Sequence, residues 1–548
     1  MPSPILQRPK HLFQPLLKHF NQRGMRATQP SAPDVLKKAQ TGPATTVTCS
    51  VYSIPAELLI EILAFLPLVC QPDELCSTSI YVSHVNTTWR VVALSHGCKA
   101  LWATLSTGLS RSGIETFVSR SDPLPMSLYL SRARIPGTSV NGVCSDLLVV
   151  HAHRFKRVAI NGRLASKLLD DEWKNISSVS PTSLALSSFT PYLSNKLPWR
   201  APISSLRRVS LVRTSINAEH PILRSSLTSL SIEKSRVGTS TETLLQALSR
   251  MPQLQELTLS LLRFYGQRDE DPSAHRQPRS VELSQLRKCV LHGYGVEVAS
   301  VFRHLSLPLD VVLNFVLEYD DITPDSQEIT GQAEFCTAVS AHIVAAHEFA
   351  EVETPFSEIA LKVKGANFTL TASGGTRDAP RPLISFHVRR HDYSIASNGT
   401  GFHDSALSAL LGIPSFSKVE RLSFSRHSNT VILDTNDIVL RQLRDVRELV
   451  LEDPHRSSRA GHGTLFSYFL QNPFPKVVRI EARQCLIPTT PLSPFLAMLH
   501  IVLIRCAVKR SFVEQLRDAC ARVDWDGVEV DEWALSEGRD LSVNQISR

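Results

Sequence analysis

The side chains that could carry out chemistry in this chain of 548 residues are acidic clusters and histidines. The acidic clusters Asp171–Glu172 and Asp269–Asp271 contain carboxylates of the kind used in acid–base catalysis, but charged runs like these are typical of a solvated surface. His347–Glu348 starts like a zinc-binding helix and lacks a second histidine one turn later. The sequence has no Gly-x-Ser-x-Gly elbow, P-loop or Gly-x-Gly-x-x-Gly start. We therefore expect that the chain is not an enzyme.

The ten cysteines are scattered along the chain and form no Cys-x-x-Cys pair. Zinc sites need closely spaced ligands, and no histidine lies at such a spacing from these cysteines, so we expect no bound metal and no other cofactor. The start of the sequence does not resemble a secretory signal, and no apolar run is long enough for a membrane span. Reduced, buried thiols and a cytoplasmic or nuclear location are expected.

The formal net charge of +8 is concentrated at the start of the chain. Residues 1–50 carry seven lysines and arginines and one aspartate, so they supply +6 of that charge. This proline-rich stretch is expected to be a disordered basic arm. The remaining chain is close to neutral, which does not favour a nucleic-acid-binding face.

The elements that would position a functional surface are clearest in residues 53–105. One helix is predicted from Pro55 to Pro67, with a turn at Pro72–Glu74 and a second helix after it. The apolar positions of the first helix are Leu58, Leu59, Ile62, Leu63 and Leu66, and those of the second are Val82, Val85, Trp89, Val92 and Ala93. Three short apolar helices in about 50 residues are only marginally stable alone, which suits a docking module.

These residues resemble an F-box. The family begins with Leu-Pro-x-x-Leu-Leu-x-x-Ile, and the chain has Ile54-Pro55-Ala56-Glu57-Leu58-Leu59-Ile60-Glu61-Ile62. The later signature Val-Cys-x-x-Trp-Arg is similar to Val85 through Arg90, with Asn86 in place of cysteine, and Leu101-Trp102 matches the closing Leu-Trp. Residues 109–130 and 302–308 are similar to segments of a fungal (basidiomycete-type) F-box-like family. Independently of any family, Met126, Leu128 and Leu130 alternate with more polar residues, which predicts a strand.

The resemblance implies a substrate-recognition subunit of an SCF-type ubiquitin ligase. In that family the F-box binds a Skp-type adaptor and, through it, a cullin–RING ligase, while the rest of the chain binds a target protein. The adaptor-binding residues implied by the resemblance are Ile54, Pro55, Leu58, Leu59, Ile62, Leu63, Val85 and Trp89. The alternative is a protein-interaction scaffold outside the ligase class, in which these helices have a structural role alone.

A six-residue pattern, apolar-x-x-apolar-x-apolar, recurs through the remaining chain. It occurs at 155–160, 206–211, 227–232, 254–259, 286–291, 419–424 and 446–451, with a related rhythm at 477–480 and 499–504. The last three positions of each unit are expected to form a short strand, with the first apolar residue packed beneath it. Segments between units, such as 241–248, have helical spacing.

The spacing of these units predicts the rest of the fold. Starts at 206, 227, 254 and 286 are 21, 27 and 32 residues apart, around the period of leucine-rich repeats. We therefore expect an α/β (α+β) chain: a short three-helix F-box module followed by an irregular leucine-rich-repeat-like solenoid. The expected organisation is a basic arm at 1–50, an F-box-like domain at 51–106, a connector at 107–150 and a substrate-binding repeat domain at 151–548.

Overall fold

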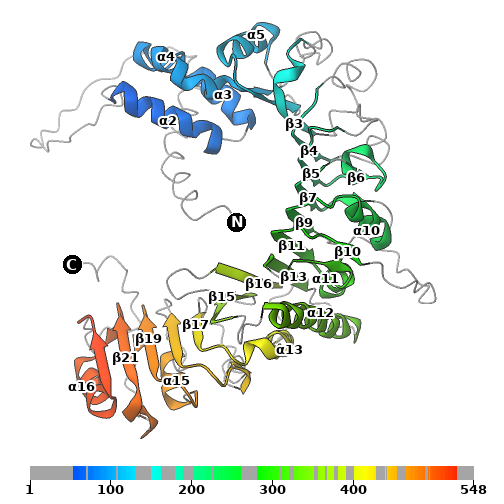
Figure 1. Cartoon of the computed structure of the whole chain (residues 1–548). Coiled ribbons are helices and arrows are strands. Elements are labelled where there is room, and N and C mark those ends of the chain that lie inside the picture. Colours follow the sequence, from blue (N-terminus) through cyan, green and yellow to red (C-terminus); the bar gives the residue numbers. More distant parts are fainter. Residues whose placement is uncertain are drawn as a thin grey trace, which may run out of the picture. The chain divides into compact units, whose positions relative to one another are not determined.

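The structure is a computed structural model of the whole chain (Figure 1). It describes residues 54–69, 72–106, 109–130, 150–161, 179–188, 203–224, 226–237, 240–260, 280–308, 310–319, 326–350, 356–364, 367–374, 381–390, 400–426, 438–439, 441–452, 465–472, 474–487, 492 and 494–527. The expected basic arm at 1–50 lies outside these residues. The chain divides into unit 1, Met1–Ser187 with Lys196–Pro198, and unit 2, Ser188–Asn195 with Trp199–Arg548.

Unit 1 begins with a group of short helices. These are α2 (Ala56–Val69), α3 (Pro72–Val82), α4 (Thr87–Ala93) and the 3-10 helix η2 (His96–Trp102). Two predicted boundaries are wrong: α2 continues past Pro67 to Val69, and Pro72 starts α3 instead of a turn. Proline fits the first turn of a helix because the N–H that it lacks has no partner there. Asn86 begins α4, where its Oδ1 accepts a hydrogen bond from the Trp89 N–H at 2.8 Å.

Trp102 is the largest fully buried side chain of the helical group. Its Nε1 donates to the carbonyl of Ala93 at 2.8 Å, and its ring packs edge-to-face on Phe117 with a centroid distance of 5.0 Å. The guanidinium of Arg120 lies over the same ring at 4.4 Å, a cation–π contact. One tryptophan therefore joins α4, η2 and the helix that follows them.

Parallel strands complete unit 1. The elements are β1 (Thr104–Ser106), α5 (Arg111–Arg120), β2 (Met126–Leu130), η3 (Ala152–Arg154), β3 (Phe155–Asn161) and β4 (Ser183–Ser187). The strands pair in the order β1-β2-β3-β4. The predicted strand at 126–130 is confirmed, with its three apolar residues buried. Because α5 and β2 fall within the expected connector, unit 1 extends well past residue 106.

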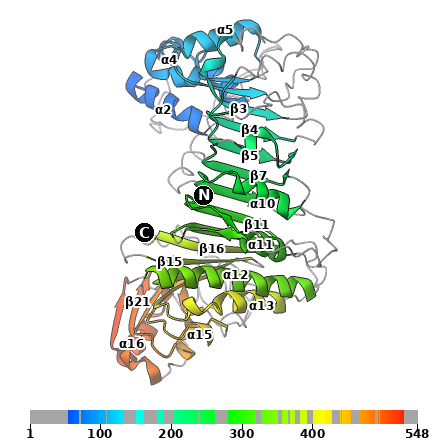
Figure 2. The same ribbon diagram turned by 45° about the vertical axis from the view of Figure 1, so that its right-hand side comes forward.

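The first half of unit 2 is a row of parallel strands with helices on one face. The strands, paired in this order, are β5 (Arg208–Val212), β7 (Ser229–Glu233), β9 (Glu256–Ser260), β11 (Lys288–Gly293) and β13 (Val312–Tyr319). Figures 1 and 2 show α10 (Thr241–Ser249), α11 (Gly295–Phe302) and α12 (Ser326–Ala350) on the same side of these strands. The predicted strands here and the predicted helix at 241–248 are confirmed.

The middle of unit 2 contains an antiparallel segment. It comprises β14 (Glu358–Lys364), β15 (Asn367–Gly374) and β16 (Arg381–Arg390). β15 pairs antiparallel with both of its neighbours, while β16 pairs parallel with β13 and β14 pairs parallel with the next strand, β17 (Arg421–Arg426). Phe315 and Phe386 stack at the β13–β16 junction with centroids 5.4 Å apart, which places an aromatic core under this segment.

Parallel pairing resumes after β17. The later strands are β18 (Glu448–Glu452), β19 (Arg479–Arg483), β21 (His500–Ile504) and β23 (Arg522–Trp525), and the later helices are α13 (Thr400–Leu411), α15 (Leu465–Gln471) and α16 (Arg510–Ala519). The strands predicted within the units at 419–424, 446–451, 477–480 and 499–504 are confirmed. Leading residues of the pattern, such as Val419 and Val446, are fully buried beneath them.

In the turns that follow several strands, a small buried side chain forms a hydrogen bond with the backbone of a neighbouring repeat. The Ser235 hydroxyl accepts a hydrogen bond from the Thr214 N–H at 2.9 Å, and the Cys506 thiol donates to the carbonyl of Ala482 at 3.2 Å. Each turn has a residue with positive φ just before the small side chain, for example Lys234 at 50°.

The expected fold, a short three-helix module followed by a leucine-rich-repeat-like solenoid, is wrong. Among the described residues, one 17-stranded, mostly parallel sheet dominates, which makes this an α/β fold. The first helices run directly into β1 of that sheet, so residues 54–102 do not form a separate helical module. The regular spacing of the six-residue units is also interrupted at β14–β16, where β15 pairs antiparallel with both neighbours. The six-residue pattern located strands correctly, but the hydrogen bonds between strands, which the pattern does not encode, determine the architecture.

Candidate functional site

The chemistry-bearing residues of the sequence do not assemble into a metal site in the described part of the chain. Within those residues, no group of three or more His, Cys, Asp or Glu side chains lies close enough to hold an ion. The clusters Asp171–Glu172 and Asp269–Asp271 fall outside the described residues, as do the side chains of His347–Glu348. None of the described helices has the length and apolar character needed to cross a membrane. Seven described cysteines are buried free thiols.

One hydrogen-bonded chain in unit 2 was missed by sequence inspection. The Ser260 hydroxyl lies 3.4 Å from His292 Nδ1, and His292 Nε2 bonds the carboxylate of Glu318, so β9, β11 and β13 each supply one member. This is the order of nucleophile, base and carboxylate in many hydrolases. However, Ser260 is only 4% exposed, so a substrate carbonyl has no open approach to its oxygen. We therefore interpret these hydrogen bonds as structural: His292 gives the buried Glu318 carboxylate a hydrogen-bonding partner.

The structure separates the eight implied adaptor-binding residues into a surface group and a core group. Pro55 and Leu58 are exposed, and Leu58 is 52% accessible. Ile54, Ile62 and Val85 are half-buried. Leu59, Leu63 and Trp89 are buried in the core of the helical group. The core residues can support a docking surface but cannot form its outer layer.

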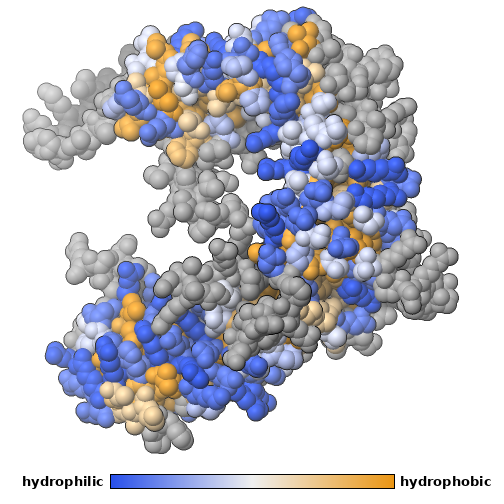
Figure 3. All heavy atoms as spheres, viewed as in Figure 1, coloured by the Kyte–Doolittle hydropathy of each residue, from blue (hydrophilic) through white to orange (hydrophobic). Residues whose placement is uncertain are grey.

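Further large apolar side chains are exposed on the same group of helices. Its large side chains are Leu58 and Phe65 on α2, Ile80 and Tyr81 on α3, and Val91 on α4 with Leu94 directly after it; we name this set the docking patch. Figure 3 shows hydrophobic surface over this part of unit 1. Soluble proteins rarely expose so many large apolar residues in one short segment unless the surface binds a partner.

Sequence reasoning could have found part of the docking patch. Leu58, Ile62 and Phe65 share one face of α2, while Leu59, Leu63 and Leu66 share another. A helix that is apolar on more than one face must bury the second face somewhere. The α3 and α4 members give no such signal, because single exposed apolar residues are common at protein surfaces.

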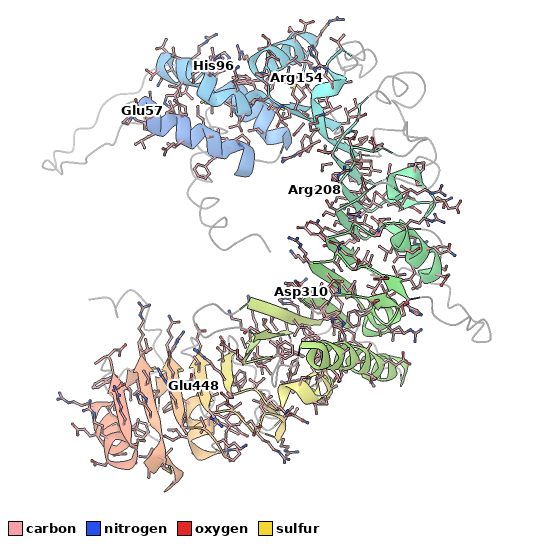
Figure 4. The ribbon with its side chains drawn as sticks, viewed as in Figure 1. Glu57, His96, Arg154, Arg208, Asp310 and Glu448 are labelled. Atoms are coloured by element: carbon pink, nitrogen blue, oxygen red, sulfur yellow. The ribbon has the colours of Figure 1, made fainter. Side chains whose placement is uncertain are left out.

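The charges around the docking patch are sparse and exposed. Glu57 and Glu61 lie on α2, and Arg90 lies on α4. Figure 4 labels Glu57 on α2, and it labels Arg154 near α5. Arg120 on α5 is another cation of unit 1, and partial burial together with Arg90 lowers the pKa of its guanidinium. Glu57 and Glu61 therefore share a helix with Leu58 and Phe65, and Arg90 is next to Val91.

Unit 2 presents a second kind of surface on the strand face that α10 and α11 do not cover. Its later strands carry charges of both signs that neutralise one another. The nearly buried Glu481 carboxylate lies 3.1 Å from Arg479 Nη2 and 2.6 Å from Arg483 Nε. On the next strands, His500 Nε2 lies 2.8 Å from the carboxylate of Asp524. This face is polar and extensively paired, so its recognition chemistry differs from that of the docking patch.

Comparison with known proteins leaves the function to be argued from these surfaces. No protein-family model matches the sequence, and no curated protein matches it.

Proposed function

We propose that this chain is the substrate-recognition subunit of an SCF-type ubiquitin ligase. In this proposal, the docking patch binds a Skp-type adaptor and, through it, a cullin–RING ligase. Unit 2 holds a target protein. The chain supplies proximity and orientation, other subunits supply the bond-making groups, and the complex works in the cytoplasm, the nucleus or both.

The docking patch is the observation that carries the proposal. It lies on the segment that resembles an F-box, and it combines exposed residues of that resemblance, such as Leu58, with exposed neighbours such as Tyr81 and Val91. The accompanying buried residues, including Leu59 and Trp89, form the core that would hold these helices in place. An apolar surface supported by its own core suits stable binding to one partner.

The loss of adaptor affinity expected from substitutions in the docking patch follows from the exposed fractions of the side chains. Leu58 is 52% and Val91 is 69% exposed, so each can still bury about half or more of its side chain. At about 1.5–3 kcal/mol for complete burial, each contributes roughly 1–2 kcal/mol to docking. An aspartate at either position also brings a charge to an apolar interface. The double variant Leu58→Asp/Val91→Asp should therefore weaken adaptor binding by at least about 100-fold.

The test is a pull-down of the purified full chain with a Skp-type adaptor, followed by calorimetry for affinity. The matched control is Val150→Asp, because Val150 is 66% exposed in unit 1 and lies outside the patch helices. We expect the control to bind like wild type and the double variant to lose binding, with unchanged circular dichroism spectra for both.

A well-folded wild-type chain that binds no adaptor would refute the proposal. The protein-interaction scaffold outside the ligase class would then be the better account. Equal loss of binding in Val150→Asp would also count against it, because the effect would then come from added charge in general.

A further inference from the structure

The last strand of unit 2, β23, has a single strand neighbour among the described residues. It pairs in parallel with β21, and the N–H of Arg522 donates to the carbonyl of Leu499 at 3.3 Å. Successive residues of a strand direct their backbone N–H and C=O groups to opposite sides. The groups of Val523 and Trp525 therefore face away from β21, and we name this side of the strand the β23 edge.

The apolar side of β23 is covered less completely than that of the strand before it. Val523 and Trp525 lie in register with Ile501 and Leu503 of β21. The two β21 residues are fully buried, whereas Val523 and Trp525 are partly exposed. A further strand beside the β23 edge would continue the same apolar layer and bury both side chains.

The two residues after β23 favour a reversal of the chain. They are Asp526 and Gly527, and Asp-Gly is a preferred two-residue loop of β-hairpins. Gly527 has a φ of 83°, a left-handed value that tight turns require and that glycine adopts without strain. The Arg505 N–H donates to Asp526 Oδ2, which holds the start of this turn against the preceding repeat.

The next segment of the sequence matches the β23 edge in pattern. Residues 528–531 read Val-Glu-Val-Asp and lie outside the described residues. A two-residue loop at 526–527 places Val528 opposite Trp525 and Val530 opposite Val523, with all four side chains on one face. Those two facing pairs are of the hydrogen-bonded kind. The β23 edge offers its backbone groups at the same two residues, so the loop length and the observed register agree.

Charge complementarity supports the same register. Asp531 falls opposite Arg522, which makes a pair of opposite charge. Glu529 falls opposite Asp524, whose carboxylate already lies 3.0 Å from Arg522 and 2.8 Å from His500. A shift of one residue would turn the two valines of the segment to the polar face and lose both matches.

We propose that residues 528–531 add an antiparallel strand to the β23 edge and close this end of the sheet. An uncovered edge offers unpaired backbone groups to other chains, so the added strand would keep unit 2 from pairing with a second copy. This docking needs neither an adaptor nor a target. The inference therefore stands apart from the ligase proposal, and each can fail without the other.

The test is an engineered disulfide between the two strands of the full chain. Asp524→Cys/Glu529→Cys puts thiols at a facing pair without mutual hydrogen bonds, where Cα atoms lie about 4.5 Å apart, within disulfide range. Asp524→Cys/Asp531→Cys is the matched control, because its thiols lie out of register. After mild oxidation with diamide, mass spectrometry should show the first link forming at least about tenfold faster than the second.

Two outcomes of this test would overturn the proposal. Equal rates for the two variants would mean that the segment does not pair, because an unpaired chain brings either cysteine to position 524 with similar frequency. A disulfide-linked dimer as the main product of Asp524→Cys alone would mean that a second copy occupies the β23 edge.

Hydrogen exchange of the full chain, resolved to single amides, provides a second measurement that needs no cysteine. The amides of Val523 and Trp525 should be protected in wild type, and Val530→Asp should speed their exchange at least about tenfold. Val543→Asp makes the same change further along the chain and should leave both amides unchanged. Rapid exchange of these two amides in wild type would also overturn the proposal.

Discussion

Arg154 offers a stability test that the structure makes quantitative. It is 7% exposed, and its guanidinium joins η3 to the end of α5 and the turn after it. Nη1 donates to the carbonyl of Val118 at 3.0 Å, while Nη2 donates to Ser121 Oγ at 2.8 Å and to the carbonyl of Leu124 at 3.0 Å. The carboxylate of Asp122 lies 3.6 Å away and is mostly exposed.

Replacing Arg154 with alanine removes the guanidinium donor from all three acceptors, and of these the Val118 carbonyl still accepts from Ser121 Oγ at 3.1 Å. Each buried acceptor that loses its partner costs about 1–3 kcal/mol, whereas the exposed contact with Asp122 contributes little. We therefore expect Arg154→Ala to destabilise this part of unit 1 by about 3–5 kcal/mol. Arg154→Lys should retain part of that energy, because a lysine cannot make the same forked contacts. The matched control is Arg111→Ala, whose exposed ion pair with Glu115 on α5 is worth about 0.5 kcal/mol.

The assay is hydrogen exchange of the full chain, followed by mass spectrometry of peptides covering 111–130. If opening of this segment controls exchange, a loss of 3 kcal/mol corresponds to about 100-fold faster exchange in Arg154→Ala. The same conversion gives only about a twofold increase for Arg111→Ala. Acceleration of less than tenfold in a folded Arg154→Ala chain would refute the reasoning, because water would then be replacing the guanidinium at little cost.

Two further predictions concern titratable groups. Burial lowers the pKa of His342, and burial together with Arg389 lowers that of His387, so the unfolded chain binds these protons more readily. The free energy of unfolding should therefore fall as the pH drops through about 6.5. Urea midpoints measured at pH 7.5 and pH 5.5 should show a smaller fall in His342→Gln than in wild type. An equal fall in both proteins would contradict the role given to His342. Burial raises the pKa of Cys289 and of Cys336 to about 12. Both thiols should resist iodoacetamide in the folded chain and react in urea, as read by mass spectrometry, and rapid labelling of the folded chain would count against this.

The strands were predictable because their signal is local. In the unit at 206–211, Val209 and Leu211 alternate with polar residues, and this alternation assigns each side chain to a face of the sheet. The architecture was less predictable because strand pairing depends on distant segments. In the sheet, β14, β15 and β16 lie in the reverse of their order along the chain, because β13 pairs with β16 and β14 pairs with β17. No spacing within the sequence encodes those pairs.

The sequence pattern of α2 showed that this helix is apolar on more than one face, but it did not show which side chains are exposed. Leu58 and Leu59 are adjacent and chemically identical, yet one is half exposed and the other fully buried. Which face of α2 becomes the core depends on Trp89 and Trp102, which fill the interior from later elements.

The two proposed surfaces have different chemistry, and this difference suits their roles. Burial of an apolar patch such as that containing Leu58 and Val91 is strong and has little directional requirement, which fits a lasting subunit contact. The strand face of unit 2 that carries Glu481 and Arg483 is polar, and a hydrogen bond on such a surface contributes only about 1 kcal/mol net but is lost when the partner's group is wrong. Under the proposed function, a target held mainly by such bonds would be bound selectively and released readily, while the adaptor stays in place. A chain that positions successive targets for another subunit's chemistry needs that combination.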